Sequence, residues 1–188
     1  MKKPFKEIKK TNIIDSSELY LNNSFLSVHR AKELYEKGIE PCDSYIFKLK
    51  KEERIFFYGQ LYNADKYVQR GISKKEEKFS WTNGKVLIVK ARLADYSPET
   101  KIQVVFDIIS IFNSKQLVIA TINNKEVYKG EIASNNNLIF KFILPEDKIV
   151  DIKLELPDAC SPKSLDLSED TRLLALAIED IQFKTDEA

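Results

Sequence analysis

The sequence predicts a mainly β protein, namely a jelly-roll-like antiparallel β-sandwich preceded by a short helical extension at the N-terminus. Three observations lead to this prediction. Short apolar segments follow one another along most of the chain after residue 40, and apolar and polar side chains alternate along many of them. Turn-forming pairs such as Asn-Gly and Asn-Asn separate these segments. Helices do not alternate with the strands, which argues against a doubly wound α/β fold.

The N-terminal part of the chain differs in pattern from the rest. Residues 1–52 are expected to form an extension, and residues 53–188 the sandwich domain. Within the extension, apolar residues of the stretch 24–37 recur at helical spacing, and Gly38 is a suitable residue to end a helix. The stretch 1–16 is rich in lysine and is expected to be a loosely attached arm.

Beyond Pro41 the spacing of apolar residues changes from helical to alternating. The segments expected to form strands are 45–49, 54–62, 79–81, 86–93, 102–112, 117–122, 126–132, 138–144, 149–156 and 172–183. The polar stretch 63–78 is expected to be a long loop that contributes nothing to the core. Asn83-Gly84 predicts a tight hairpin between the strands on either side of it, and Asn123-Asn124 predicts another.

Composition excludes several classes of partner. Lys and Arg total 30 and Asp and Glu total 29, so the formal net charge is +1, which gives no basis for binding nucleic acid or an anionic membrane. No apolar run approaches the roughly 20 residues that a membrane-spanning helix needs. We expect a cytoplasmic location if the chain is complete, and a cell-surface or periplasmic one if it is cut from a longer protein. The oligomeric state stays open.

The residues that most often hold metals or attack substrates are scarce. Cys42 and Cys160 are the two cysteines, and reduced structural thiols are the expected reading, with a disulfide left open. The single histidine, His29, cannot supply the several ligands of a cupin metal site, and no nucleophile motif accompanies it. We therefore predict no metal, no cofactor and no catalytic residue.

Carboxylates cluster at two places, before Trp81 and in the polar loop near the C-terminus. Glycosidases use a pair of carboxyl groups, one of which needs a raised pKa through burial, and burial cannot be judged from sequence. In the C-terminal loop, Asp170 and Arg172 are expected to pair by charge-assisted hydrogen bonds. With Ser161 and Ser168 they form the predicted structural latch, a set of four residues that would seat the last strand.

Trp81 is the single tryptophan and the centre of the candidate ligand site. Sugars place C–H faces on aromatic rings and hydroxyl groups against polar side chains, and Glu77, Arg70 and Tyr62 lie near Trp81 in the sequence. We therefore predict a carbohydrate platform formed by these four residues. The competing reading, which is the commoner one for an aromatic next to a hairpin in a sandwich, places Trp81 in the core.

Two motifs and a turn resemble parts of a known family of domains. They are Ser161-Pro162-Lys163-Ser164-Leu165 with Ser168-Glu169-Asp170-Thr171-Arg172-Leu173-Leu174-Ala175-Leu176-Ala177, Gly71-Ile72-Ser73 with Glu77-Lys78-Phe79-Ser80-Trp81-Thr82-Asn83-Gly84-Lys85, and Ile122-Asn123-Asn124-Lys125-Glu126-Val127. Together they resemble the accessory β-sandwich domain appended to bacterial glycosyltransferases of surface-polysaccharide synthesis. The resemblance covers roughly residues 55–183, and Asp166 and Ala175 stand where that family frequently has glycine.

That resemblance implies a domain similar to a carbohydrate-binding module and without catalytic activity of its own. Its partner would be a glycan or a glycosyltransferase, and its role would lie in the assembly of bacterial surface glycans or glycolipids. Two other functions stay open. One is a protein–protein interaction module that uses the extension or a sheet face. The other is a glycan-modifying enzyme that would need a deep pocket with two close carboxylates.

Overall fold

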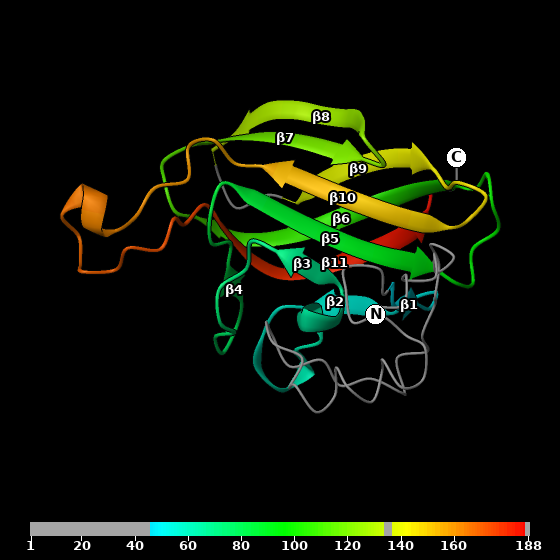
Figure 1. Ribbon diagram of the computed structural model, residues 1–188, viewed down its shortest axis with the longest axis horizontal. Helices are drawn as coiled ribbons and strands as arrows, with labels where there is room; N and C mark the ends of the chain where they lie inside the picture. The colour runs from blue at the N-terminus through cyan, green and yellow to red at the C-terminus, as the bar shows by residue number, and fades with distance from the viewer. Residues whose placement is uncertain (1–45, 134–136, 187–188) are drawn as a thin grey trace, which may run out of the picture.

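The computed structural model describes residues 46–133 and 137–186 and shows two β-sheets packed face to face (Figure 1). The prediction of a mainly β sandwich is confirmed. The predicted helix at 24–37, the arm at 1–16, His29 and Cys42 lie outside the described residues. No helix in the described part of the chain is long and apolar enough to cross a membrane.

One sheet has six strands. They are β1 (Lys48–Leu49), β3 (Val68–Arg70), β5 (Val86–Leu93), β7 (Gln116–Ile122), β8 (Lys125–Ile132) and β10 (Ile149–Glu155). Their order is β1-β5-β10-β7-β8, and β3 also pairs with β5. The pairing of β1 with β5 is parallel, and the other pairings in this sheet are antiparallel.

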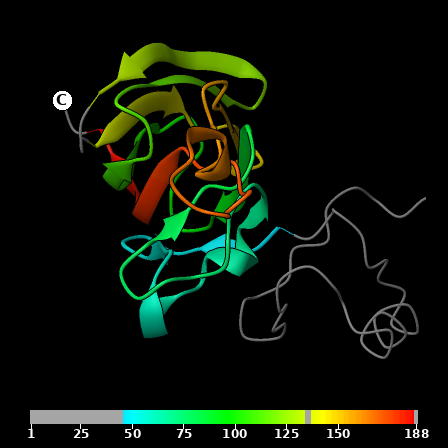
Figure 2. The ribbon, with the colours of Figure 1, turned by 90° about the vertical axis from the view of Figure 1, so that its left-hand side faces the viewer.

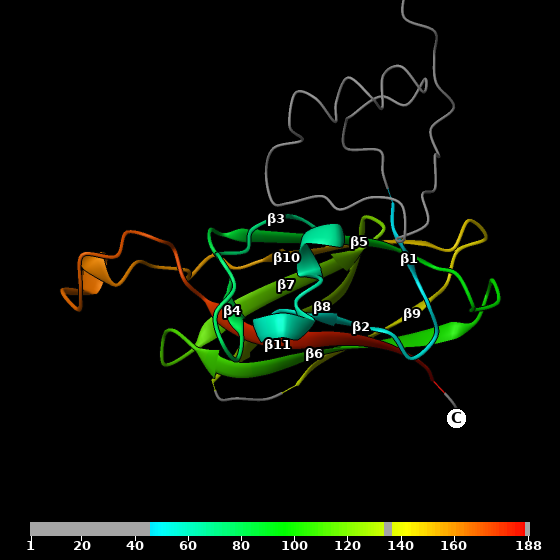
Figure 3. The same cartoon turned by 90° about the horizontal axis from the view of Figure 1, so that it is seen from below.

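The other sheet has five strands. They are β2 (Arg54–Phe56), β4 (Ser80–Trp81), β6 (Lys101–Ile111), β9 (Leu138–Ile143) and β11 (Leu176–Thr185). The order is β2-β11-β6-β9, and β4 pairs with β11 as well, so β11 lies in the interior of this sheet (Figure 3). Three short 3-10 helices complete the described elements: η1 (Gly59–Leu61), η2 (Ala64–Lys66) and η3 (Lys163–Leu165).

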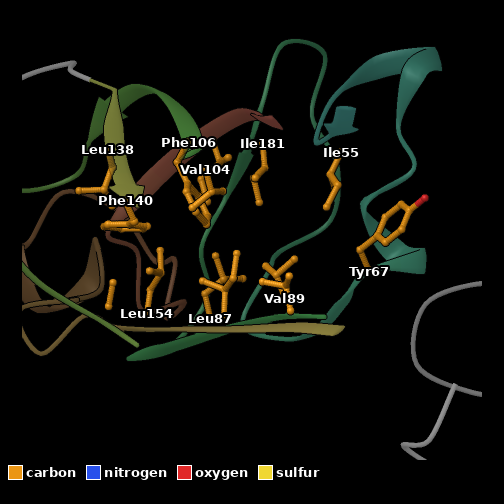
Figure 4. Packing of buried hydrophobic residues seen from close by; sticks show 14 of the residues in the cluster. Ile55, Tyr67, Leu87, Val89, Val104, Phe106, Leu138, Phe140, Leu154 and Ile181 are labelled. Carbon is orange, nitrogen blue, oxygen red and sulfur yellow. The ribbon is translucent and has the colours of Figure 1, made fainter. Parts of the chain in front are cut away.

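The core forms between the inner faces of the two sheets, because alternate residues of each strand point inward. Along β5 the buried residues are Leu87, Val89, Ala91 and Leu93. Figure 4 shows side chains of the two sheets pointing toward one another, among them Val104, Phe106, Ile181, Leu87, Val89 and Leu154. Phe47 and Leu49 also belong to this core, although they precede the predicted boundary at residue 53.

The two predicted hairpins have different outcomes. The turn Asn123-Asn124 joins β7 to β8, with φ of 50° and 65°, so this prediction is confirmed. The hairpin at Asn83-Gly84 is wrong, because β4 pairs with β11 while β5 belongs to the other sheet. Gly84 does have a positive φ of 107°, but it marks the place where the chain passes from one sheet to the other.

Two further predictions need correction. The stretch 63–78 contains η2 and β3, and Tyr67 within it is completely buried, with its ring 6.1 Å from that of Phe47. The stretch is therefore part of the core despite its polar composition. The last strand begins at Leu176 rather than at residue 172. The preceding residues belong to the loop between β10 and β11, which projects from one end of the sandwich (orange in Figure 1) and is called the projecting loop below.

Candidate ligand-binding site

Trp81 lies on a hairpin that leaves β3 and returns as β4. Ile72 pairs with Thr82, and the N–H of Ser73 donates to the carbonyl of Trp81 at 2.9 Å. The returning strand β4 pairs with β11, which places Trp81 opposite Ala177 and Ser80 opposite Ile178. The hairpin therefore holds the tryptophan against the five-stranded sheet.

The side chain of Trp81 points away from the core. Opposite residues in an antiparallel pair project to the same face. Ser80 and Ile178 face the core, where the Ser80 hydroxyl donates to the carbonyl of Phe57 at 2.5 Å. Trp81 and Ala177 therefore face outward, and the ring of Trp81 is half-buried. The reading that placed Trp81 in the core is wrong.

Two phenylalanines flank the ring of Trp81. The ring centroid of Phe79 is 5.7 Å away at an interplanar angle of 84°, and that of Phe112 is 5.8 Å away at 90°. We call these three residues the Trp81 corner, because the neighbouring rings stand perpendicular to the indole. Such edge-to-face contacts stabilise aromatic groups beyond the area that they bury, so the indole has a defined orientation on the surface.

An ion-pair chain connects this hairpin to the projecting loop. Nε and Nη2 of Arg172 donate to Asp170 Oδ2 at 2.9 and 2.6 Å, and Nη1 of Arg172 lies 3.9 Å from Oε1 of Glu76. Glu76 belongs to the hairpin, where its N–H donates to the carbonyl of Phe79 at 3.0 Å. Polar groups from two separate segments therefore meet at the turn of the hairpin that carries Trp81.

The hydrogen bonds of Arg172 fix the charge state of Asp170. They hold the pKa of the Asp170 carboxyl below its ordinary value, and the same contact raises the pKa of the Arg172 guanidinium. A general acid in glycoside hydrolysis needs the opposite, a carboxyl group whose pKa is raised. Asp170 is thus suited to holding Arg172 in place rather than to donating a proton.

The two serines of the predicted latch bond within the projecting loop. Ser161 Oγ accepts from the N–H of Ser164 at 3.1 Å, and Ser168 Oγ accepts from the N–H of Asp170 at 3.2 Å. The N–H of Lys163 donates to the carbonyl of Asp170 at 2.9 Å, which closes the loop across its width. These bonds order the loop itself. Arg172 links the loop to the hairpin through Glu76, and the N–H of Gly84 donates to the carbonyl of Leu173 at 2.8 Å.

The other predicted platform residues lie at different distances along the hairpin. Glu77 is exposed at its tip, and Tyr62 follows η1 with Lys75 Nζ 5.7 Å from its ring centroid. Arg70 is in β3, opposite Ile88 of the six-stranded sheet. Trp81, Glu77 and Tyr62 thus belong to the hairpin or to the segment beside it, whereas Arg70 stands at its base.

Phe79, Phe112 and Arg172 were not predicted as members of the platform. Phe79 had a signal, because residues two apart in a strand share a face and Trp81 is two residues further on. Phe112 had none. Phe112 reaches Trp81 because β6 and β4 lie on the two sides of the same stretch of β11, where Ser110 and Trp81 both pair with Ala177. This register cannot be read from the sequence.

Phe112 also lines a polar groove. It has a volume of about 570 Å³, and Figure 2 looks onto this end of the molecule. Its lining residues are Phe112, Asn113, Ser114, Lys115, Glu131, Asp158 and Leu165, and we call it the end groove. Asn113 Nδ2 donates to the carbonyl of Asp158 at 2.7 Å, and the Cys160 thiol donates to Asn113 Oδ1 at 3.1 Å. These bonds tie one wall of the groove to the other.

The arrangement offers aromatic and polar side chains but no evident metal site. Among residues 46–133 and 137–186, no three His, Cys, Asp or Glu side chains are placed to hold a metal ion. Surface aromatic rings next to fixed hydrogen-bonding groups are suited to binding a ligand that has both apolar faces and hydroxyl groups.

No protein-family model matches the chain, and no curated protein matches it. Solved structures give weak similarities. A family 35 carbohydrate-binding module from an environmental isolate has a TM-score of 0.37 at 12% identity, over 63% of this chain and 85% of that one. An acetyl xylan esterase from Butyrivibrio proteoclasticus has a TM-score of 0.37 at 11% identity, over 65% and 31% of the two chains.

A third structure, a calcium-binding mutant of Bacteroides uniformis β-glucuronidase 2, has a TM-score of 0.36 at 10% identity, over 77% of this chain and 20% of the other. This chain therefore spans about a third or less of the esterase and the glucuronidase chains. All three TM-scores are below 0.5, so no conclusion about function follows from these similarities.

Proposed function

We propose that the protein is a non-catalytic carbohydrate-binding domain whose platform is the Trp81 corner. The observation that carries the proposal is a single tryptophan held half-buried on the outer face of a sheet, between Phe79 and Phe112. An indole outside the core contributes less to folding than one within it, and its exposed part offers a ligand apolar surface.

Polar side chains complete the platform. Glu76 is joined to Phe79 by a backbone hydrogen bond and lies 3.9 Å from Arg172, and Glu77, Tyr62 and Arg70 would extend the rim along the hairpin. Hydrogen bonds from such groups would orient the hydroxyl groups of a sugar ring. Alanine at Glu77, Tyr62 or Arg70 is expected to weaken binding less than alanine at Trp81. These three side chains would contribute single contacts at the rim, whereas the indole of Trp81 is the surface on which the sugar stacks.

The first prediction concerns Trp81→Ala. A glycan array identifies the bound glycans, and isothermal titration calorimetry then measures the affinity of wild type and variant. We expect the variant to bind at least about tenfold more weakly, because hot-spot aromatics dominate binding energy. The fold should persist because the side chain lies outside the core. In the wild type, Trp81 fluorescence should change on titration, since no other tryptophan is present.

Phe56→Ala is the matched control. Phe56 is another half-buried aromatic residue on the outer face of the five-stranded sheet, opposite Asp180, with its ring 5.8 Å from that of Tyr58. This variant should retain glycan affinity. Equal affinity of Trp81→Ala and wild type would contradict the proposal, and so would a wild type that binds no glycan on the array.

We place this binding activity in the assembly of bacterial surface glycans, with a glycosyltransferase as the partner. The support is the resemblance of the motifs at 71–85, 122–127 and 161–177 to domains appended to such enzymes. Polysaccharide-synthesis genes next to the gene for this chain, and a glycosyltransferase that co-purifies with the protein, are the expected observations. A neighbourhood without such genes and a preparation without such an enzyme would count against the role.

Strand β9 favours a second candidate function, a protein–protein interaction module. It is the last strand in the order of the five-stranded sheet, and Ile139 and Ile143 on its outer face are 45% and 61% exposed. Exposed apolar residues on an edge strand are a common docking surface. A glycan array without hits, together with a stoichiometric protein partner that Ile143→Lys releases, would favour this function over glycan binding.

A further inference from the structure

We infer that the ligand is a neutral oligosaccharide chain that extends from Trp81 past Phe112 into the end groove. The inference rests on the proposed function, because it takes Trp81 as the first subsite. It adds a second subsite in the groove that Phe112 lines, and it predicts a preference for neutral glycans and for longer chains.

Phe112 is the residue that joins the two subsites. Its ring packs at a right angle to the indole of Trp81, and the same residue lines the end groove. The N–H of Phe112 donates to the carbonyl of Ala175 at 2.8 Å, which fixes its backbone to the residue before β11. A chain that stacks on Trp81 and continues along Phe112 would therefore reach the groove.

The lining of the groove matches the chemistry of a sugar. Asn113, Ser114 and Asp158 present amide, hydroxyl and carboxylate groups, and Lys115 contacts both carboxylate oxygens of Glu131 at 3.1 Å. Leu165 adds an apolar surface to the lining and is 48% exposed. Sites for neutral polar ligands combine such apolar walls with a few placed hydrogen-bonding groups.

The walls of the groove are fixed before a ligand arrives. The turn between β6 and β7 is bound to the projecting loop through Asn113 and Asp158, and Asp158 Oδ2 also accepts from the N–H of Leu117 at 2.8 Å. The backbone of Cys160 pairs with that of Leu174 at 3.2 and 2.9 Å. A site that is already ordered loses little conformational entropy on binding, which favours affinity for a flexible glycan chain.

The charges of both subsites argue for a neutral ligand. In the groove, Lys115 is paired with Glu131, and Asp158 adds a further negative charge. At the Trp81 end, Arg172 is held by Asp170 and lies near Glu76, so two carboxylates surround one guanidinium. Lys115 and Arg172 are thus already paired with carboxylates, and the further carboxylate of Asp158 gives the groove a net negative charge, so a uronic acid would be repelled there.

The test measures affinity as a function of chain length. Three ladders are titrated against the protein by Trp81 fluorescence and by calorimetry. They are glucose to cellotetraose, glucose to maltotetraose, and galacturonic acid to its trimer. We expect one neutral ladder to gain about tenfold or more in affinity between the monosaccharide and the trisaccharide, and the acidic ladder to bind more weakly at every length.

Leu165→Asp tests the second subsite without changing Trp81, and Leu61→Asp is its control. Both leucines lie in short 3-10 helices and are similarly exposed, at 48% and 55%, but Leu61 is in η1 and does not line the groove. Leu165→Asp should remove the gain with chain length and leave the fluorescence response to the monosaccharide unchanged. Leu61→Asp should change neither.

Different results overturn the second subsite and the proposed function. The second subsite is overturned if a glycan binds with equal affinity at every chain length, or if the gain in affinity with chain length persists in Leu165→Asp. In either case Trp81→Ala still tests the first subsite. Tighter binding of trigalacturonic acid overturns the preference for neutral sugars. If no ladder binds, the inference of an extended neutral ligand is wrong. The glycan array then shows separately whether the protein binds any glycan.

Discussion

Gly71 and Gly84 stand at the two ends of the hairpin that carries Trp81. Both have positive φ, 92° and 107°, a conformation that side chains rarely adopt. Their surroundings differ. A Cβ on Gly71 would lie 2.0 Å from the carbonyl oxygen of Val86, whereas a Cβ on Gly84 would meet no heavy atom within 4 Å. The close approach of two backbone segments, rather than φ alone, makes Gly71 the more constrained position.

This difference leads to a prediction for two matched alanine variants. Gly84→Ala should lower the free energy of unfolding by about 1 kcal/mol, the cost of the unfavourable φ. Gly71→Ala should lower it by about 3 kcal/mol or more, because the backbone of β5 must also move. Urea unfolding followed by Trp81 fluorescence measures both values. Equal losses would show that the contact with Val86 relaxes at no cost.

At this scale the sequence revealed local relationships and missed distant ones. Asp170 and Arg172 are two residues apart, so their pairing could be expected from the sequence alone, and Phe79 could have been placed beside Trp81 by the same reasoning. The outward direction of Trp81 could not. It depends on which residue of β11 lies opposite, and alternation along a two-residue strand is too short to decide between two faces.

At the scale of elements, β11 organises the five-stranded sheet. It pairs with β6 along one edge, and with both β4 and β2 along the other. The register with β6 shifts between Ile178 and Asp180, which leaves Glu179 without a residue opposite. The N–H of Phe57 donates to the carbonyl of Glu179 at 2.9 Å, so the bulge provides the bond that holds the end of β2.

Thr82 fixes the junction between β4 and β11. Its N–H donates to the carbonyl of Leu176 at 2.8 Å, and its Oγ1 accepts from the N–H of Leu176 at 3.0 Å, with both residues completely buried. Thr82→Val keeps the shape and removes the acceptor, which leaves a buried N–H unpaired. We expect a loss of about 1–3 kcal/mol in the free energy of unfolding.

Thr82→Ser is the control for this prediction, because it keeps the hydroxyl group and loses a methyl group. It should be more stable than Thr82→Val in chemical denaturation. Amide hydrogen exchange at Leu176 should be fastest in the valine variant. If the two variants are equally stable, the hydroxyl bond does not hold the junction.

Most strands could be predicted from their alternation, and the exceptions have physical reasons. The pattern marks β5, β7 and β10 clearly, since each has one face on the core and one toward solvent. The Asn-Gly signal failed because it reports that the backbone can turn and says nothing about the partner of the following strand. Tyr67 was missed because one buried aromatic among charged neighbours leaves no periodic signal.

For the whole molecule, Asp186 joins the end of β11 to its sheet. Its Oδ2 lies 2.7 Å from Lys101 Nζ at the start of β6, and its Oδ1 lies 2.8 Å from Lys141 Nζ in β9. These two lysines hold the pKa of the Asp186 carboxyl below its ordinary value. A depressed pKa in the folded state stabilises the protein above the ordinary pKa, and this contribution disappears as the pH falls through the folded-state pKa.

Stability should therefore depend on pH through Asp186. At neutral pH, Asp186→Asn should have a lower free energy of unfolding than wild type, and the difference should shrink as the pH falls below about 4. Urea unfolding across this range measures it. Asp166→Asn is the control, because Asp166 is exposed and has a φ of 55° that asparagine tolerates. A difference that does not change with pH would contradict the role assigned to the carboxylate.

The class of fold was predictable as a whole, but the strand order was not. Alternation and turn signals are local, so they identify strands and indicate a sandwich. Which strands pair depends on contacts between distant segments, as when β5 pairs with β10 and β11 with β2. The end groove was invisible to the sequence for the same reason, because its walls come from residues 112–115, Glu131, Asp158 and Leu165.

The central place of β11 also has a consequence during protein synthesis. The ribosome makes β2, β4 and β6 well before β11, yet all three pair with it. Until that segment emerges, the inner faces of these strands lack their shared neighbour, and their backbone edges are open to other chains. The interval between the translation of β6 and that of β11 is thus the period in which a nascent chain of this protein most needs a chaperone.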